Sequence, residues 1–532
     1  MQKLLFTLCL ICLFLTTKAQ QGIDVLHYKF NILLNDKNDT IYGQAEIKIK
    51  FLQPVSFFTI DLATIDNWKK GMIVDEVLSV RPEIKSYIAK DNKINVFLSH
   101  PQKINDSAIF SFYYHGVPSD GLIISKNKYG DRTFFADNWP NRAHNWIPCI
   151  DDLLDKASFE FLVTAPSHYK IISNGVKVEE KILPDNKKLT HWKEDISLPT
   201  KVMVIGVADF AIKEYADSPP DVPVTAWIFS RDSTKGFFDY SLAPNILKFF
   251  SGYIGPYPYK KLANVQSKTI FGGMENAGAI FYRESSVTGK QQDVESLLAH
   301  EIAHQWFGDM ATEKSFTHLW LSEGFATYLA HIYISSRYGT DSFEAEMKID
   351  REKIIELERF SPKPVVDSVT PYMELLNANR YERGSWILHM LQRQLNDSVF
   401  HQIIRSYYET YKGKNADTKD FEAIAEKISG KDLGYFFKQW PYTSQIPNLI
   451  INWSYDDKEK KLSVSVEQMQ NTEPFIFPLE ILIESESGKN QIETLAINKK
   501  KQTFTFSIPR PSKIIADPDT SLLFDGRVKE PK

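Results

Sequence analysis

The sequence predicts a multidomain α+β protein, and three observations support this fold class. Its 532 residues exceed what a single hydrophobic core usually organises. Apolar and polar residues alternate in short runs from His27 to about Phe210, and again after Pro441, which favours strands. Between about Leu242 and Trp440 the apolar residues recur at helical spacing. We therefore expect an N-terminal antiparallel β domain, a mainly α-helical domain and a small C-terminal β-sandwich.

The changes of pattern along the chain set the expected domain limits. They are a signal peptide at 1–19, the N-terminal β domain at 20–212, the helical domain at 213–440 and the C-terminal β-sandwich at 441–532.

The first residues are typical of a cleaved export signal. Lys3 precedes an apolar run from Leu4 to Leu15, and small or polar residues follow up to Ala19. A membrane anchor is the alternative, but a bilayer span needs about 20 apolar residues and this run is shorter. We expect cleavage near Ala19, export to a bacterial periplasm or to the cell exterior, and no membrane span in the mature chain.

Cysteine and charge limit the possible partners. Cys9 and Cys12 lie within the signal, so Cys149 remains alone in the mature chain, where it forms no intrachain disulfide and is expected to pack as an apolar side chain. Lys and Arg number 63 against 67 Asp and Glu, and no block of like charge occurs. Nucleic acid is therefore not an expected partner, and the oligomeric state stays open.

Strand patterns define the two β domains. Residues Ala45–Phe51 alternate with a period of two, and comparable runs are "IFSFYYH", "SFEFLVTAP" and "KVMVIGVADF". Past Pro441 the strand candidates are "LIINWSY", "KLSVSVEQ", "FPLEILIES", "QTFTFSI" and "SKIIADP", separated by turn-forming residues. Regular spacing of these later strands favours a sandwich.

Helical patterns fill the region between the β domains. They are "VESLLAHEIAHQWF", "GFATYLAHIYISSRYG", "GSWILHMLQRQL" and "DFEAIAEKISG". Asp417 or Asp420 is the candidate N-cap of the last helix, and Gly430 is its candidate end.

The first of these helices carries a candidate metal site. His300 and His304 are four residues apart, so they project from one helix face, one turn apart, and two imidazoles can reach one ion. Asp293 is the candidate cap of this helix and Gly308 its candidate end.

A catalytic zinc needs a third protein ligand and an open position for water. Glu323 opens the next helical pattern after a loop, with Ser322 as its candidate cap, and is the natural third ligand. Glu301, beside His300, fits a general base that accepts a proton from water. The pattern predicts one Zn²⁺ per chain.

A chance match is the alternative for this site. With 12 histidines in the chain, a random His-Glu-x-x-His occurs on the order of a few per cent of the time. The placed third glutamate lowers that rate, and two unpartnered imidazoles on an apolar helix would be costly to bury. We therefore favour the metal site.

Four segments occur in a fixed order and spacing: "FGGMENAGAIFYRE", "HEIAHQWFGD", "WLSEGFATY" and "YERGSWILHML". Together they resemble the aminopeptidase N-type family of zinc metallopeptidases, the gluzincins, over roughly His27 to Trp440. The resemblance implies a thermolysin-like catalytic domain and peptide substrates with a free N-terminus.

The resemblance also implies roles for individual residues. Gly272, Gly273, Met274, Glu275 and Asn276 match the family's substrate-binding edge strand, in which the glutamate binds the free α-amine. A buried carboxylate forms a favourable ion pair with a charged N-terminus. A blocked peptide leaves this carboxylate without a partner, so the site selects substrates with a free N-terminus.

Tyr381 matches the family tyrosine that stabilises the oxyanion, a task that suits a phenol donor. The implied reaction is hydrolysis of the N-terminal peptide bond, with the carbonyl between zinc and Tyr381. Glu301 would take the proton of the water and return it to the leaving nitrogen.

Two departures from the family pattern stand out. Many members have an upstream glutamine at the amine end, where this chain has "ADNWPN", so Asp137 or Asn138 is the candidate replacement. Family members usually finish with a helical domain over the active site, whereas a small β domain occupies that position here. The chain resembles a short form, and a more open site is expected.

Two other functions compete with this interpretation. An epoxide hydrolase of the same family shares the Gly-Gly-Met-Glu-Asn stretch but usually continues with Pro-Cys, where this chain has Ala277 and Gly278. A non-catalytic peptide-binding scaffold usually loses the metal ligands or the base, and all of them are present here.

Overall fold

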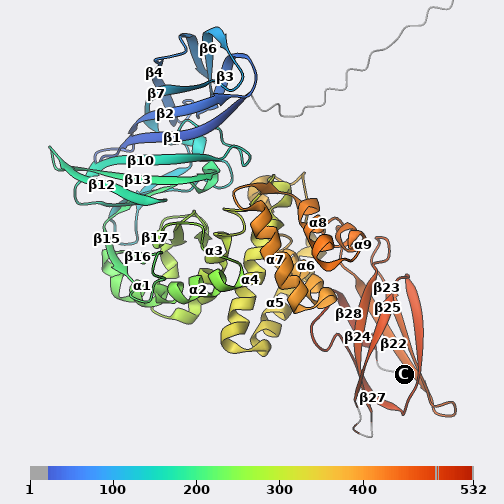
Figure 1. Ribbon diagram of the computed structural model, residues 1–532. Helices are drawn as coiled ribbons and strands as arrows, with labels where there is room; N and C mark the ends of the chain where they lie inside the picture. The colour runs from blue at the N-terminus through green and yellow to red at the C-terminus, as the bar shows by residue number, and fades with distance from the viewer. Residues whose placement is uncertain (1–21, 486–487, 489, 530–532) are drawn as a thin grey trace, which may run out of the picture.

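The computed structural model describes residues 22–485, 488 and 490–529. Figure 1 shows a β-rich N-terminal part, a helical middle and a C-terminal β domain at the end of the helical part that faces away from the N-terminal one. The predicted multidomain α+β fold is confirmed. The predicted signal peptide, 1–19, lies outside the described residues.

The N-terminal part consists of three sheets. Its strands are β1 Ile23–Leu33, β2 Ile41–Phe51, β3 Val55–Asp61, β4 Gly71–Ser79, β5 Ile84–Lys90, β6 Lys93–Gln102, β7 Ser107–Val117, β8 Leu122–Lys126, β9 Arg132–Ala136, β10 Ala157–Pro166, β11 Lys170–Ser173, β12 Val176–Leu183, β13 Lys187–Leu198 and β14 Ile205–Ala208. The large sheet has the order β12-β13-β10-β1-β2-β7-β4, the second β11-β14-β9-β8 and the third β3-β6-β5. Pairing is antiparallel except between β1 and β10. Cys149 is fully buried in this core, as expected.

A five-stranded sheet leads into the helical part, in the order β15-β16-β17-β19-β18. Its strands are β15 Phe210–Glu214, β16 Val224–Phe229, β17 Leu262–Ser267, β18 Gly273–Met274 and β19 Ala279–Arg283. The run "KVMVIGVADF" is therefore not one strand, because β14 and β15 belong to different sheets. The short β18 is the edge strand and pairs antiparallel with β19.

The helical part carries the predicted amphipathic helices. Its elements are α1 Ser233–Asp239, α2 Ala243–Tyr253, α3 Glu295–His304, β20 Thr312–Glu313, α4 Trp320–Tyr338, α5 Thr340–Phe360, α6 Glu382–Leu395, α7 Asp397–Tyr411, β21 Asn415–Ala416, α8 Thr418–Ser429 and α9 Gly434–Gln439. Asp417 caps α8 in a capping box with Asp420, and Gly430 ends it in the left-handed region, as the sequence predicts.

The C-terminal part is a sandwich of two sheets, in the orders β26-β23-β22-β28 and β25-β24-β27. Its strands are β22 Asn448–Asp456, β23 Lys461–Gln468, β24 Phe477–Ser485, β25 Gln491–Ile497, β26 Lys501–Ser507, β27 Pro511–Ala516 and β28 Asp525–Lys529. Its apolar residues continue the core of the helical part.

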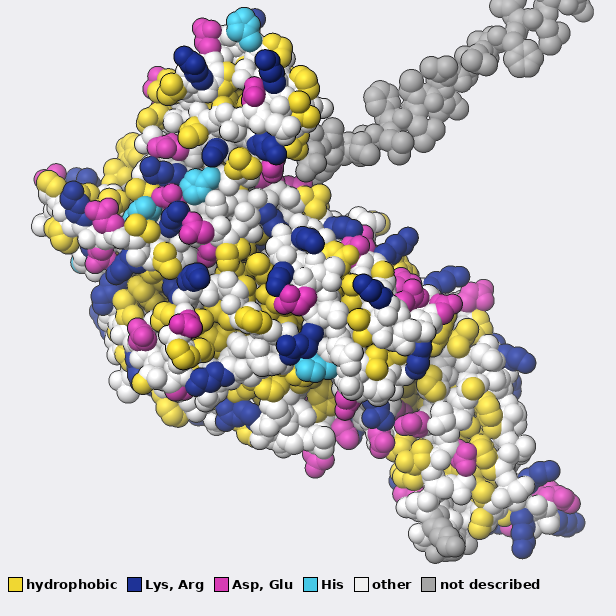
Figure 2. Space-filling model, viewed as in Figure 1, with side chains coloured by type: hydrophobic (Ala, Val, Ile, Leu, Met, Phe, Trp, Pro, Cys, Tyr) yellow, Lys and Arg dark blue, Asp and Glu magenta, His cyan; other side chains and the backbone are white. Residues whose placement is uncertain are grey.

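Surface chemistry agrees with the balanced composition. Figure 2 shows basic and acidic side chains interspersed over the visible face rather than gathered by sign. Over the described residues, no helix combines the length and the apolar character that crossing a bilayer requires.

Candidate metal centre and active site

The three predicted metal ligands converge from two antiparallel helices. His300 and His304 lie on α3 and Glu323 on the first turn of α4. The two Nε2 atoms are 3.0 Å apart, and Glu323 Oε2 lies 3.3 Å from His300 Nε2 and 3.2 Å from His304 Nε2. Ligands about 2.0–2.1 Å from a tetrahedral zinc stand about 3.3 Å from one another. The donor set therefore fits zinc. Among the described residues, these three side chains form the group of His, Cys, Asp or Glu residues that could hold a metal ion.

The surroundings of His304 orient its ring. Nδ1 lies 3.1 Å from the carbonyl oxygen of Phe307 and 3.0 Å from Ser322 Oγ. A carbonyl oxygen only accepts, so Nδ1 carries a proton, which leaves Nε2 as the atom that would bind a metal ion. The prediction that Ser322 caps α4 is wrong, because the helix begins at Trp320 and the hydroxyl contacts the histidine instead.

Two further details of α3 differ from the sequence prediction. Val294 is the N-cap and no side chain caps the helix, so Asp293 does not have the predicted role. Asp293 belongs to a short 3-10 turn before the helix. The helix ends at His304, and Gly308 lies beyond that end with φ +118°.

When no metal is bound, His304 and Glu323 attract each other as opposite charges. Burial lowers the pKa of His304, but the nearby Glu323 carboxylate outweighs it and raises that pKa to about 10. Burial likewise opposes ionisation of Glu323, yet His304 and His300 hold the pKa of this carboxyl well below its usual range. A divalent cation at this position would displace the proton from His304.

Glu301 lies on α3 beside His300 and is 5% exposed. The backbone of β18 passes against its carboxylate, since a Cβ added to Gly273 would lie 2.2 Å from Glu301 Oε1. Burial, reinforced by Glu275 and Glu323 and opposed by His304, raises the pKa of Glu301 well above its ordinary value. Glycine at 273 thus permits the edge strand to border the candidate base.

The candidate amine-binding strand borders the same cavity. This cavity of about 490 Å³ is lined by Gly272, Gly273, Met274 and Glu275 together with His300, Glu301, His304, Glu323 and Tyr381. Gln305, just past α3, donates to the backbone oxygen of Glu275 at 2.6 Å and so ties the strand to the end of the metal-site helix. Asn276 is fully buried, is not among the residues that line the cavity, and donates from Nδ2 to the backbone oxygen of Met274 at 3.4 Å.

Tyr381 precedes α6 and its ring stacks on that of His300, with centroids 5.7 Å apart. Helices α4 and α6 approach closely at two glycines, since a Cβ on Gly324 would lie 2.8 Å from the backbone of Gly384. Burial, and after it Glu323 and Glu275, raises the pKa of the Tyr381 phenol well above its ordinary value. The phenol is therefore a hydrogen-bond donor beside the ligands.

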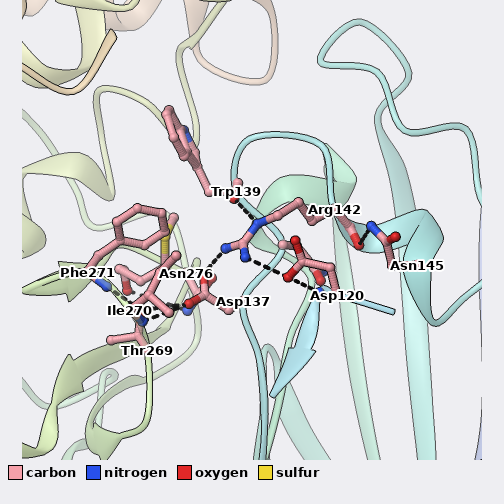
Figure 3. Close-up of polar contacts among 12 residues, drawn as sticks. Asp120, Asp137, Trp139, Arg142, Asn145, Thr269, Ile270, Phe271 and Asn276 are labelled. Atoms are coloured by element: carbon pink, nitrogen blue, oxygen red, sulfur yellow. Dashed lines mark hydrogen bonds and ion pairs between the residues drawn. The ribbon is translucent and has the colours of Figure 1, made fainter. Parts of the chain in front are cut away.

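Neither Asp137 nor Asn138 reaches the cavity, so the expectation that one of them replaces the family glutamine is not supported. Figure 3 shows the Asp137 carboxylate between Arg142 and the turn before β18. It is 2.7 Å from Arg142 Nη2 and accepts hydrogen bonds from Thr269 Oγ1 and Ile270 N, each at 3.0 Å. Asn138 is fully buried against backbone carbonyls.

Trp139 lines the cavity instead, a residue that the sequence reasoning missed. Its ring packs edge-on against Phe271 and Phe316, with both centroid distances 5.6 Å, and its carbonyl accepts a hydrogen bond from Arg142. The loop that Asp137 and Arg142 hold thus supplies an apolar wall to the cavity.

A His-Glu-x-x-His helix with a third glutamate from the next helix is the donor set of a metal-dependent hydrolase. Residues 25–202 match the peptidase M1 N-terminal domain, and residues 238–440 match the peptidase family M1 domain. The chain belongs to peptidase family M1, which confirms the resemblance.

Several relatives are named aminopeptidases. Probable aminopeptidase 2 of Sulfurisphaera tokodaii is 30% identical over 383 residues, 68% of this chain and 48% of that relative. Aminopeptidase 2, mitochondrial, of Saccharomyces cerevisiae is 23% identical over 530 residues, 92% and 54% of the two chains. Glutamyl aminopeptidase of Homo sapiens is 26% identical over 335 residues, which are 60% of this chain and 35% of that relative. The chain spans about half the length of these relatives, or less.

Proposed function

We propose that the protein is a zinc-dependent aminopeptidase that hydrolyses the N-terminal bond of peptides, with one Zn²⁺ held by His300, His304 and Glu323. One observation carries the proposal: a second carboxylate, Glu275, faces the same cavity as the His-His-Glu group and the candidate base. A buried carboxylate that lines the cavity beside the candidate metal ligands can pair with the charged α-amine of a peptide. Export to a periplasm or to the cell exterior is part of the proposal and rests on the N-terminal sequence.

The chain's own residues supply recognition, positioning and proton transfer. When bound, zinc would act as a Lewis acid toward the scissile carbonyl and would make a water molecule more acidic. Glu275 accepts hydrogen bonds from the α-ammonium group, and the strand backbone at Gly272 and Gly273 lies along the peptide. Glu301 takes a proton from the attacking water and gives it to the leaving nitrogen, while Tyr381 donates a hydrogen bond to the carbonyl oxygen.

Peptides with a free N-terminus are expected to be cleaved at least about a thousandfold faster than their N-acetylated forms, because an acetylated peptide leaves the buried Glu275 carboxylate without its cationic partner. The measurement is kcat/KM for paired free and acetylated peptides, with native protein and Glu275→Gln. The variant should lose most of this discrimination. Equal cleavage of both peptide forms by the native protein would rule out amine recognition at Glu275.

Tyr381→Phe is expected to lower kcat by about a hundredfold to a thousandfold, because it removes a donor aimed at charge that develops in the transition state. KM should change little, since the ring and its stacking on His300 remain. Tyr372→Phe is a matched control, because Tyr372 does not line the cavity. A Tyr381→Phe enzyme with an unchanged kcat would assign the phenol a purely structural role.

A further inference from the structure

Part of the same cavity is lined by residues that the proposed reaction does not use. We call it the distal arm. It is lined by Ser296, Leu297, Thr327, His331, Glu346, Asp350, Lys353 and Glu382, from α3, α4, α5 and the start of α6.

The helix axes give the direction of the distal arm. Glu275 is tied to Gln305 at the C-terminal end of α3, whereas Ser296 lies at its N-terminal end, about 13 Å away along the axis. On α4, His331 lies eight residues after Glu323, about 12 Å further along. Tyr338, at the end of α4, contacts Glu295 at the start of α3. The C-terminal end of α4 and the N-terminal end of α3 therefore lie on the same side of the metal ligands. The distal arm therefore lies on the side of the metal site opposite Glu275.

A peptide held by its amine at Glu275 must send its leaving segment toward this arm. An extended chain advances about 3.3 Å per residue, so the second and third residues of the substrate lie about 3 to 7 Å beyond the scissile bond. A long side chain on either residue extends further into the cavity, which the α5 residues Glu346, Asp350 and Lys353 also line. The group that fills the distal arm is thus part of the substrate itself.

The distal arm is negatively charged. It holds the carboxylates of Glu346, Asp350 and Glu382 and the single ammonium of Lys353. Lys353 Nζ lies 2.9 Å from Glu382 Oε1 and 3.5 Å from Asp350 Oδ1, so its charge is already matched. Glu346 is partly buried and forms no ion pair among the described residues. An unmatched carboxylate in a confined cavity attracts a cation.

A buried histidine adds an unused acceptor at the same place. His331 is 5% exposed, and its Nε2 lies 2.8 Å from Asp350 Oδ2. A carboxylate only accepts, so Nε2 carries a proton, and Nδ1 keeps a lone pair in the neutral form of the ring. Nδ1 is buried and has no hydrogen-bond partner among the described residues. Because Nδ1 is itself buried, the carboxylates of the arm, and Glu346 above all, carry the attraction for a cation.

We propose that the distal arm is a subsite for a lysine or arginine side chain at the second or third position of the peptide substrate, with Glu346 as its main charge partner. The proposal rests on the proposed aminopeptidase function. It makes the enzyme selective for the residues beyond the cleaved bond as well as for a free amine. A docked C-terminal carboxylate is disfavoured, because Lys353 is already neutralised by its two neighbours.

The test compares peptides that share one N-terminal residue and carry Lys, Gln or Glu at the second or the third position, each with an amidated C-terminus. We expect kcat/KM to be about tenfold higher for Lys than for Gln at one of the two positions, and lower still for Glu. The preference should weaken as salt is raised. Glu346→Gln should bring the Lys-to-Gln ratio close to one, and Glu346→Lys should reverse the order.

Glu344→Gln is the matched control. Glu344 lies on the same helix, pairs with Lys348 at 3.3 Å and does not line the cavity, so its replacement should leave every ratio unchanged. If the native protein released N-terminal residues at equal rates from all the peptides, or if Glu346→Gln kept the Lys preference, the subsite would be wrong and the aminopeptidase would stand. If no peptide were cleaved at all, the proposed function itself would fail. The Gln peptides are also made with a free C-terminus, and faster cleavage of these than of their amidated forms would assign the arm to carboxylate binding and overturn the proposal.

Discussion

Glu301→Gln is expected to lower kcat by about a thousandfold while the protein still binds one equivalent of zinc. The amide has the shape of the carboxylate but cannot accept the proton of the attacking water, and general-base catalysis of this kind contributes roughly a hundredfold to ten-thousandfold. Metal binding should persist because Glu301 is not one of the three converging side chains. Metal analysis and steady-state kinetics on the same sample give both values.

The pH dependence of the native enzyme provides an independent check. Glu301 must be ionised to act as a base, and burial raises the pKa of its carboxyl well above the ordinary glutamate value. Activity should therefore fall as the pH decreases through the pKa of Glu301, and bound zinc should place this acid limb lower than in the metal-free site. The residual activity of Glu301→Gln should lack this limb.

Glu295→Gln serves as the matched control for this prediction. Glu295 is also a buried glutamate on α3, but it accepts hydrogen bonds from Tyr333 and Tyr338 and lies outside the cavity. Its replacement should cost stability and leave kcat within about twofold. A Glu301→Gln enzyme that kept more than a tenth of native kcat with bound zinc would show that another group accepts the proton.

Regular spacing made the His-His-Glu group and the fold class predictable. Two histidines one turn apart on an amphipathic segment must share a helix face, and a glutamate at the start of the next helix can return to them. Strand alternation predicted β2, β7 and β10 in the same way. These features depend on local periodicity, which a single sequence displays.

Short polar residues were harder to assign, because several local roles compete for each of them. Ser322 looked like a cap and instead contacts His304, while Asp137 looked like an amine ligand and instead holds the turn before β18. Glu346 and Lys353 lie on α5, far in sequence from the metal ligands, so no motif spacing links them to the cavity. Their placement follows from helix packing, which the linear pattern does not specify.

His304→Ala is expected to abolish both zinc binding and activity, because it removes one of three ligands and the ring that Ser322 and Phe307 orient. Chelation of the native protein should have the same effect on activity, and added zinc should restore it. The fold should survive loss of the metal, since the pKa of His304 near 10 lets it pair with Glu323 as a cation. Zinc binding near pH 7 must then release the proton from His304, so the affinity for zinc should fall as the pH decreases.

The matched control for His304→Ala is His401→Ala. His401 lies on α7, away from the cavity, and its Nε2 donates to the carbonyl oxygen of Tyr253 at 2.6 Å. This variant should keep its zinc and its kcat and lose only about 1 kcal/mol of unfolding free energy, the usual worth of one hydrogen bond. Zinc content and circular dichroism separate the two outcomes. If His304→Ala retained tightly bound zinc and native activity, the metal would have to be held by other residues, and the role of Glu301 as the base beside it would fail as well.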